Sequence, residues 1–366
     1  MTTAAEVYEL PAVAVRTLSD PALLLELHCI SISHYCMRAK WALQLAGLPF
    51  TSVHHLPLAH VLGIKRLQGR VGQGPAAPTA SSKSAVATPV LAVYSAQGKP
   101  LCLLANSTLI SRYAALRAQA LGLPGAAQLY GPALTLAQPA AAAAAGDGAA
   151  GDGGSSSSRV TGAGRLYEAV EALELRLSGT LGIEVRRVMY HYLLPHWHLA
   201  GHLFSANASG AAERLLSPLT YLLSRLLLPK VLAINAATAA RAKQRLLEEF
   251  DYLDSLLLAQ QQQSKEAAGQ GAAAGADAND ASSSSSSSLP YYICGPELTA
   301  ADVSLAALGG YVVGVPASRM GLHWSPGMEH MPQELQRFMQ TLRDRPTGKL
   351  ILELWRVHGP LAQHPQ

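Results

Sequence analysis

This sequence has few charged residues, few aromatic residues and few cysteines. Only 14% of its 366 residues are charged and 6% are aromatic, although 49% are hydrophobic. Alanine supplies much of that apolar fraction, so we expect stretches that cannot bury enough apolar surface to fold. The 28 basic and 24 acidic residues give a formal charge of +4 without a dense Lys/Arg block, which argues against nucleic acid as a partner.

The four cysteines are sparse and irregularly spaced, at Cys29, Cys36, Cys102 and Cys294. This spacing argues against a disulfide framework, and against a zinc module, which needs paired ligands at short intervals. We therefore expect no metal cofactor and a reducing compartment. We expect a cytoplasmic location, with an organellar location as the alternative.

Long uncharged apolar runs are also missing. Residues 118–146 are uncharged but interrupted by proline and glycine, and residues 215–234, the most apolar helical candidate, contain Arg225 and Lys230. A spanning helix needs about 20 predominantly apolar residues. We expect no membrane span, and a buried helix, or a helix pair split at Pro229, over 215–234. Residues 1–20 resemble neither a secretory signal nor a transit peptide.

Three low-complexity tracts divide the chain, at residues 69–87, 132–164 and 260–288. Each lacks the apolar periodicity that would offset the entropy cost of ordering it. We predict that 69–87 and 260–288 are disordered insertions, and that 132–164 is a disordered linker between two domains.

The segments between the tracts are patterned. Apolar runs predict strands at 22–29 and 50–56 and a hairpin of strands 88–94 and 99–104, and helical spacing predicts helices 35–46, closed by Gly47, and 106–121. This order predicts an α/β domain with a mixed four-stranded sheet over residues 21–122, after an N-terminal extension of residues 1–20.

Residues 165–358 are almost wholly helical in pattern and predict an all-α helical-bundle domain. The expected helices cover residues 166–177, 183–194, 211–239, 240–258, 299–312 and 332–354. Thr299 and Asp302 form a capping box in front of an apolar run, so both should nucleate a buried helix and have a structural role.

Four residues, Ser33-His34-Tyr35-Cys36, stand where the first strand turns into the first helix. A helix N-terminus presents unpaired N–H groups and a partial positive charge, which stabilise an anion. A serine hydroxyl at this turn can donate a hydrogen bond to a thiolate and so lower the pKa of that thiol.

The segment SHYCMRAK resembles the active-site turn of thioredoxin-like proteins. Glutaredoxins read Cys-Pro-Tyr-Cys followed by Ala-Lys, and this chain matches at Tyr35-Cys36 and Ala39-Lys40, with Ser33 for the first cysteine and His34 for the proline. A serine in that position is typical of serine-type glutathione transferases. The resemblance implies a thioredoxin-like N-terminal domain, glutathione as co-substrate and Ser33 as the catalytic residue.

Each of these residues also has a structural interpretation. Ser33 is as readily an ordinary N-cap, since serine is preferred there. Cys36 is more often a small buried hydrophobic residue than a reactive thiol. Arg38 falls where several glutathione-transferase classes also carry an arginine.

A second set of residues matches the same family in order. Thr88-Pro89 precedes a strand, and in the family this proline is cis and leaves the preceding backbone free to pair with the cysteine of glutathione. Asn106-Ser107 stands where the family has an acidic residue and a serine that hold the γ-glutamyl group. The resemblance thus implies glutathione binding by Ser33, Thr88, Pro89, Asn106 and Ser107, with asparagine replacing the acid.

The family resemblance extends to residues 165–358 and implies a hydrophobic co-substrate pocket between the domains. We expect His34, Tyr35, Tyr190 and Tyr192 to line it. A half-buried helix end with satisfied histidines is the alternative for the cluster around Tyr190. The histidines at 191, 196 and 198 do not share one helical face, which argues against a metal site.

Three functions follow from these patterns. The leading one is a glutathione transferase that joins the glutathione thiol to a small hydrophobic electrophile. The alternatives are a glutathione-dependent thiol oxidoreductase that uses Cys36, and a non-catalytic glutathione-transferase-like binding module. The sequence leaves open whether the chain forms a homodimer.

Overall fold

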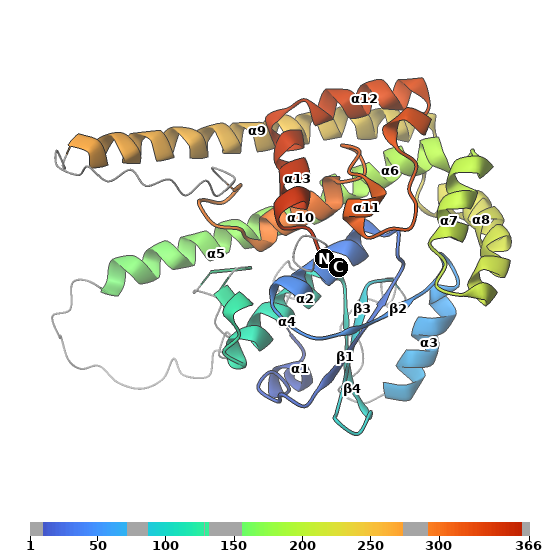
Figure 1. Cartoon of the computed structure of the whole chain (residues 1–366), viewed down its shortest axis with the longest axis horizontal. Coiled ribbons are helices and arrows are strands. Elements are labelled where there is room, and N and C mark those ends of the chain that lie inside the picture. Colours follow the sequence, from blue (N-terminus) through green and yellow to red (C-terminus); the bar gives the residue numbers. More distant parts are fainter. Residues whose placement is uncertain (1–9, 72–86, 128, 132–155, 274–291, 361–366) are drawn as a thin grey trace.

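The protein has an α/β part and a helical part, as expected (Figure 1). The computed structural model describes residues 10–71, 87–127, 129–131, 156–273 and 292–360. The sheet and its helices come from the residues before 131, and the helical part comes from residue 156 onward.

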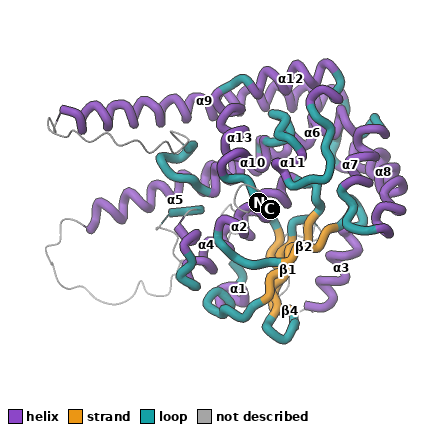
Figure 2. Tube along the Cα trace, in the orientation of Figure 1, coloured by secondary structure: helices purple, strands orange, loops and turns teal. Residues whose placement is uncertain are grey.

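The sheet has four strands in the order β2-β1-β3-β4. Figure 2 shows the strands in orange beside the purple helices. The strands are β1 Leu24–Cys29, β2 Thr51–His54, β3 Val90–Tyr94 and β4 Pro100–Ala105. β1 is parallel to β2 and antiparallel to β3, and β3 and β4 form an antiparallel hairpin. The predicted mixed sheet is therefore confirmed. The parallel pair needs a crossover, which a helix supplies.

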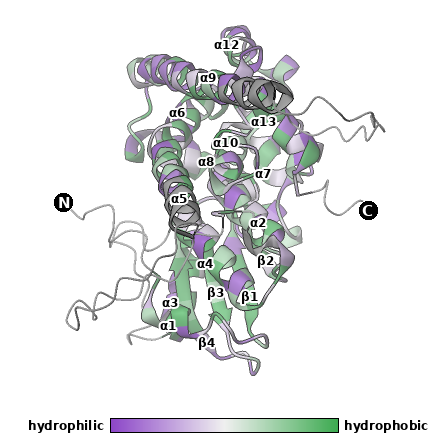
Figure 3. Ribbon diagram, turned by 90° about the vertical axis from the view of Figure 1, so that its left-hand side faces the viewer, coloured by the Kyte–Doolittle hydropathy of each residue, from purple (hydrophilic) through white to green (hydrophobic). Residues whose placement is uncertain are grey.

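Helices cover both faces of the sheet, whose strands are largely hydrophobic (Figure 3). α2 His34–Leu45 and α4 Ser107–Ala120 share the main core with one face, and α3 His60–Val71 packs Ile64 and Leu67 on the other. α3 was not predicted from the sequence, because it buries only those two apolar residues and its glycines weaken helix propensity. Gly47, with φ +68°, follows the end of α2 as predicted.

The helical part is built from long helices joined by short segments. Its α-helices are α5 Ser156–Gly179, α6 Leu181–Leu193, α7 His202–Ala206, α8 Ala211–Val231, α9 Ala236–Ala273, α10 Ala300–Gly309, α11 Ala317–Met320, α12 Gln333–Arg343 and α13 Pro346–Val357. A π-helical turn, Trp197–Gly201, precedes α7, and 3-10 turns occur at Pro124–Ala127 and Met328–His330.

The predicted disorder is wrong at the edges of all three low-complexity tracts. Residues 69–71 belong to α3, 156–164 to α5 and 260–273 to α9. In α5 and α9 these residues extend helices that neighbouring apolar patterns already support, and helix propagation costs far less than nucleation. Residues 69–71 form the end of α3, which the sequence did not predict. The rest of the tracts lies outside the described residues.

Two further predictions need correction. Residues 332–354 form α12 and α13 rather than one helix, because Arg345 precedes Pro346 and takes an extended conformation (φ −72°, ψ 157°). Within the expected N-terminal extension, α1 Ala12–Arg16 packs on the α/β part. Ala14 and Leu18 are buried there, and the Arg117 guanidinium donates to backbone carbonyls of residues 17, 18 and 20.

The prediction of a buried helix over residues 215–234 is wrong. α8 runs past Pro229 to Val231 and exposes most of its leucines. Within the described ranges, no single helix is long and apolar enough to cross a membrane; α8 and residues Ala236–Gln262 meet that criterion only as a pair bent by 75°.

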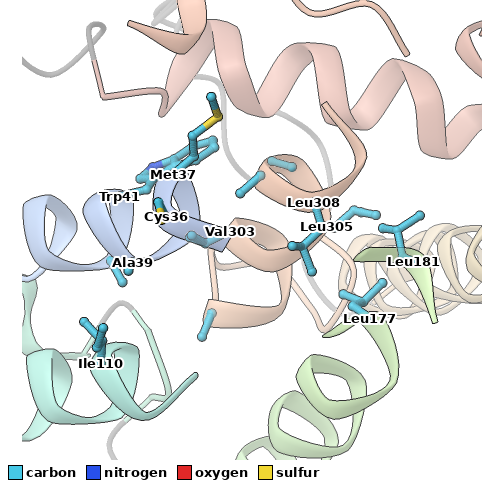
Figure 4. Close-up of a cluster of buried hydrophobic side chains, with 14 of the residues drawn as sticks. Cys36, Met37, Ala39, Trp41, Ile110, Leu177, Leu181, Val303, Leu305 and Leu308 are labelled. Carbon is cyan, nitrogen blue, oxygen red and sulfur yellow. The ribbon is translucent and has the colours of Figure 1, made fainter. Parts of the chain in front are cut away.

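One apolar core joins the two parts of the molecule (Figure 4). Met37 and Trp41 of α2 lie close to Val303 and Leu308 of α10 in this cluster. Trp41 also packs on Trp355 of α13, with ring centroids 4.6 Å apart. α2 begins directly after Ser33. Because the helical part packs on α2, it fixes the position of this helix and of the turn that carries Ser33.

A buried ion pair lies within this core. Arg38 of α2 pairs with Glu174 of α5, and the two side chains are 0% and 1% exposed. The Arg38 guanidinium also donates to the hydroxyls of Thr108 on α4 (2.8 Å) and Ser178 on α5 (2.6 Å). Ser304 of α10 donates to the same Glu174 oxygen at 3.3 Å. One guanidinium and one carboxylate therefore connect four helices.

The capping box at α10 forms as predicted from the sequence. The Asp302 carboxylate accepts hydrogen bonds from the Thr299 N–H (2.9 Å), the Thr299 hydroxyl (2.7 Å) and the Ile293 N–H (2.8 Å). Burial raises the pKa of Asp302 to about 6, and these hydrogen bonds oppose that rise. Thr299 and Asp302 lie in the core and have a structural role there.

Removing one partner of the Arg38–Glu174 pair should strongly destabilise the protein. Arg38→Met leaves a buried carboxylate unpaired, and we expect the free energy of unfolding to fall by about 3–5 kcal/mol. The double variant R38M/E174L removes both charges and should recover part of the loss. Urea denaturation of the three proteins measures both effects, and equal stability of R38M and wild type would contradict this account.

Asp302 should make stability depend on pH. Its folded-state pKa of about 6 lies above its ordinary value of 3.8, so the folded state binds the proton more tightly. Relative to Asp302→Asn, the wild type should gain stability as pH falls from 7 to 4, and lose that gain as pH rises through about 6. Denaturation at pH 4.5 and 7 tests the sign; a difference that does not change with pH would refute it.

Candidate active site

Ser33 ends the turn between β1 and α2. Its backbone is extended (φ −87°, ψ 121°), and its carbonyl accepts the Met37 N–H at 2.9 Å, so it occupies the N-cap position. Its side chain makes no capping hydrogen bond. The interpretation of the Ser33 hydroxyl as an ordinary helix cap is therefore wrong, and the residue lines a cavity.

Cys36 lies one turn inside α2 and is buried. Burial raises the pKa of its thiol, against hydrogen bonds from the Ser33 hydroxyl, the Ile30 N–H (3.4 Å) and the Thr88 hydroxyl. Its sulfur borders a separate cavity of about 140 Å³, not the cavity that Ser33 lines. These surroundings favour a neutral thiol.

A cavity of about 360 Å³ brings together four residues that the sequence singled out; most of its surface is apolar, and we call it the polar cavity for the hydroxyl, amide and guanidinium side chains in its lining. Thr88, Pro89, Asn106 and Ser107 all line it. The Thr88-Pro89 peptide bond is cis, as the family resemblance implied. The Asn106 N–H donates to the Pro89 carbonyl at 3.2 Å, which ties the start of α4 to the cis-proline turn.

Asn106 has φ 74° and ψ 149°, a backbone combination that residues other than glycine rarely adopt, so its conformation is strained. Its side-chain oxygen accepts the Leu109 N–H at 2.8 Å and caps α4. Ser107 follows as the first residue of α4 and is buried at the cavity wall. The N-terminus of a 14-residue helix therefore lies at one end of the polar cavity, where it favours an anion.

An apolar cavity of about 230 Å³ lies next to the polar one. Ser33, His34 and Tyr35 line it from α2 and the preceding turn. The opposite walls come from α6, α7 and α8, whose apolar lining residues are Val185, Met189, Leu193, Leu203, Phe204 and Leu228. The α/β part supplies the polar groups, and the helical part supplies most of the apolar surface.

The two cavities meet at residues common to both. Tyr35, Ala87, Thr88 and Arg186 each line the polar and the apolar cavity. They therefore form one groove, with Asn106 and Ser107 at one end and the apolar walls at the other. Ser33 lines only the apolar cavity.

Arg186 of α6 is the positive charge at this junction. It makes no ion pair with the carboxylates of the described residues, and its Nε is buried without a hydrogen-bond partner. Burial, and second to it the charge of Arg186, lower the pKa of His34 to about 3. Burial raises the pKa of Tyr35 and Tyr190, and the charge of Arg186 partly opposes that rise. Arg186 is half-buried, and a partly desolvated guanidinium without a carboxylate partner favours an anionic ligand.

The side chains around Ser33 are held by contacts across the two parts. The Tyr35 hydroxyl donates to the Ser178 carbonyl at 2.9 Å, and the His34 ring hydrogen-bonds the Gly182 backbone. The Tyr311 hydroxyl donates to the Ile32 carbonyl at 3.0 Å, directly before Ser33. The groove is thus preorganised by residues from α5, α6 and the segment after α10.

Of the two tyrosines expected from α6, only one reaches the groove. Tyr190 lines the apolar cavity. Tyr192 points elsewhere, and its hydroxyl accepts a hydrogen bond from Lys243 at 3.1 Å. His191 borders a different cavity with Arg225 and Ile234. The part of the chain that the structure describes contains no group of three or more potential metal ligands.

No family model matches this chain, and neither does any curated protein sequence. The function must therefore be argued from the groove itself. That groove combines an anion-favouring helix terminus, a hydroxyl at a second helix terminus, an unpaired guanidinium and an apolar wall.

Sequence reasoning missed Arg186 and Tyr311. Arg186 lies four residues before Tyr190, so helical spacing puts both on one face of α6, and that signal could have identified it. Tyr311 lies just beyond α10, in a segment expected to be an apolar helix. Only the packing of that segment on the turn before Ser33 brings its hydroxyl to the site.

Proposed function

We propose that this protein is a glutathione transferase-like enzyme with a thioredoxin-like N-terminal domain. The observation that carries the proposal is the continuous groove. Its polar end is lined by Thr88, Pro89, Asn106 and Ser107, and its apolar end is lined by Ser33. A peptide thiol fits the first chemistry, and a hydrophobic electrophile fits the second.

The order of the elements is compatible with the proposed domain. A βαβ unit (β1-α2-β2) is followed by α3, a hairpin and α4, around a sheet in the order β2-β1-β3-β4. The cis Thr88-Pro89 bond occurs at the start of β3, where the resemblance implied it.

Ser33 would activate the thiol of glutathione. A thiolate bound at the N-terminus of α2 gains from the partial positive charge of that helix and from a hydrogen bond donated by the Ser33 hydroxyl. Both effects favour the charged form, so they lower the pKa of the bound thiol. The thiolate, rather than the thiol, is the nucleophile.

The charged ends of glutathione have matching groups in the groove. A carboxylate at the start of α4 would meet the backbone N–H groups there and the Ser107 hydroxyl. Arg186 would add a positive charge between the two cavities, and its unpartnered Nε is consistent with an anionic ligand. Asn106 supports the turn as a helix cap and carries no charge for the ligand's ammonium group.

The reaction would be nucleophilic attack by the thiolate sulfur on an electrophilic carbon. A sulfur–carbon bond forms, and the electron pair released leaves with a departing anion or, in an addition, is neutralised by a proton from water. The groove contributes by orienting the two reactants and by holding the sulfur as its anion. The apolar walls from α6 to α8 would select hydrophobic co-substrates.

The oxidoreductase alternative has less support. Cys36 is buried, its thiol has a raised pKa, and it does not line the groove. Low accessibility and a neutral thiol both slow thiol–disulfide exchange. The non-catalytic alternative differs from the leading one only in turnover, so an assay separates them.

Ser33→Ala should impair catalysis far more than glutathione binding. Loss of a hydrogen bond to a charged group costs roughly 10- to 100-fold in kcat/KM, and the pKa of the bound thiol should rise. Calorimetric titration with glutathione and conjugation assays with aryl halides and enones measure the two effects.

Ser255→Ala, a remote serine on α9, is the matched control, and Cys36→Ser should keep conjugation activity. Absence of glutathione binding at millimolar concentration would refute the proposed function. Binding without turnover on any electrophile would favour the non-catalytic module, and loss of a disulfide-reductase activity only in Cys36→Ser would favour the oxidoreductase.

Arg186→Gln should weaken glutathione binding by roughly tenfold or more, because the ligand then loses a partly desolvated positive charge. Arg187→Gln is the matched control, since the Arg187 guanidinium is already paired with Glu184 at 2.8 Å. Calorimetry on both variants provides the comparison. Equal affinities of R186Q and wild type for glutathione would show that Arg186 does not take part in binding.

A further inference from the structure

The amphipathic pattern of α8 is reversed relative to a normal surface helix. Its protein-facing side carries Ser217, Thr220, Tyr221 and Ser224. Its outward side is made of apolar residues, which we call the leucine face: Leu215, Leu216, Leu219, Leu222, Leu223, Leu226, Leu227 and Val231. A helix that serves only the interior of a soluble domain has the opposite arrangement.

The leucine face runs the full length of α8. Leu215 near its start is 82% exposed, and Val231 at its end is 75% exposed. The intervening leucines recur at helical spacing, so they form one continuous stripe. α8 packs on α7 and the π-helical turn at the edge of the molecule (Figure 1). Contiguous apolar surface of this kind marks an interaction site.

The polar side of α8 is adapted to the protein interior. The Thr220 hydroxyl donates to the Ser217 carbonyl at 2.9 Å, and the Tyr221 hydroxyl donates to the Leu194 carbonyl at 2.9 Å. The Ser224 hydroxyl is buried without a hydrogen-bond partner among the described residues, so the hydrogen bonds of Thr220 and Tyr221 satisfy only part of this side. The helix is therefore docked in a defined orientation, with its leucines outward.

After Glu213, all the charged residues of α8 are positive. Arg214, Arg225 and Lys230 are exposed on α8, and the next acidic residue after Glu213 is Glu248. Glu213 itself accepts hydrogen bonds from the Ser209 N–H and hydroxyl. We propose that α8 binds in the plane of an anionic lipid surface, with the leucine face in the acyl region and these basic residues at the headgroups.

A second copy of the chain fits this face less well. A symmetric pair of α8 helices would bring Arg214, Arg225 and Lys230 against the same residues of the other copy. No exposed, unoccupied carboxylate on α8 could compensate them. Like charges set opposite each other disfavour such an interface, whereas an anionic membrane neutralises them.

Trp197 is an exposed indole next to α8. Its side chain is 51% exposed, and its ring packs edge-on against Tyr221 of α8 with centroids 4.8 Å apart. Indole rings favour the boundary between headgroups and acyl chains. Because Tyr221 is on the protein-facing side of α8, this contact places Trp197 beside α8 and not on the leucine face.

Binding in the plane also connects this surface to the groove. Leu228 and Leu232, at the end of α8, line the apolar cavity. A membrane-bound α8 would hold that cavity beside the acyl chains, where lipophilic molecules are concentrated. The sharp 75° turn between α8 and α9 suits a helix lying on the surface rather than one crossing it.

Vesicle binding by the full-length protein tests the proposal. We expect binding to phosphatidylcholine vesicles that contain phosphatidylserine, weaker binding to phosphatidylcholine alone, and loss of binding at high salt. The variant L219Q/L222Q/L226Q should lower the partition coefficient about tenfold or more. The variant R214Q/R225Q/K230Q should lower it roughly fivefold for each charge removed. Trp197 fluorescence should shift to shorter wavelength on binding, and Trp197→Phe should remove that shift.

The matched control is L24Q/L175Q/L258Q, which changes three exposed leucines outside α8. It should bind vesicles as the wild type does, and circular dichroism checks that every variant is folded. Failure of the wild type to bind anionic vesicles would overturn the proposal, as would equal loss in the control. A wild-type dimer that L219Q/L222Q/L226Q dissociates would instead assign the leucine face to a second copy. None of these readouts depends on glutathione.

Discussion

The buried pair of Arg38 and Glu174 is the constraint on which the rest of the structure depends. Two charges removed from water must be matched closely, because neither can be left unpaired at low cost. The pair and its hydroxyl partners come from α2, α4, α5 and α10, so these helices can adopt only arrangements that keep the charges together. The same helices position Ser33 at one end of α2 and Ser107 at the start of α4. The geometry of the groove therefore depends on the packing of these helices between the α/β part and the helical part.

The groove divides its chemistry between these two parts. Turns and helix termini of the α/β part present backbone N–H groups, a cis-proline turn and the Ser33 hydroxyl, whereas the helical part contributes Arg186 and apolar walls. Neither part alone would form it. Leu228 and Leu232, at the end of α8, line the apolar cavity, so the helix that carries the leucine face also contributes to the wall of the groove. This arrangement suits co-substrates that dissolve poorly in water.

Much of the fold could be predicted because the signals are local. Short apolar runs mark β1 and the β3–β4 hairpin, Gly47 marks the end of α2, and Thr299 with Asp302 marks the start of α10. α3 could not be predicted, since it depends on two residues that pack on the far face of the sheet. The helical ends of the low-complexity tracts also escaped prediction, because composition describes a segment on average and ignores the helix it extends.

The sequence by itself determined which short motifs exist and the order in which they follow each other: Ser33 at a helix start, Thr88-Pro89 before a strand, and Asn106-Ser107 at another helix start. Only the tertiary structure decided that these motifs share a groove, that Arg186 lies at its centre, that Tyr192 points away and that the leucines of α8 face outward. The physical reason is that periodicity defines the faces of a helix but not which face is buried. That choice depends on partners distant in the sequence, and for α8 the partners bury its hydroxyl groups.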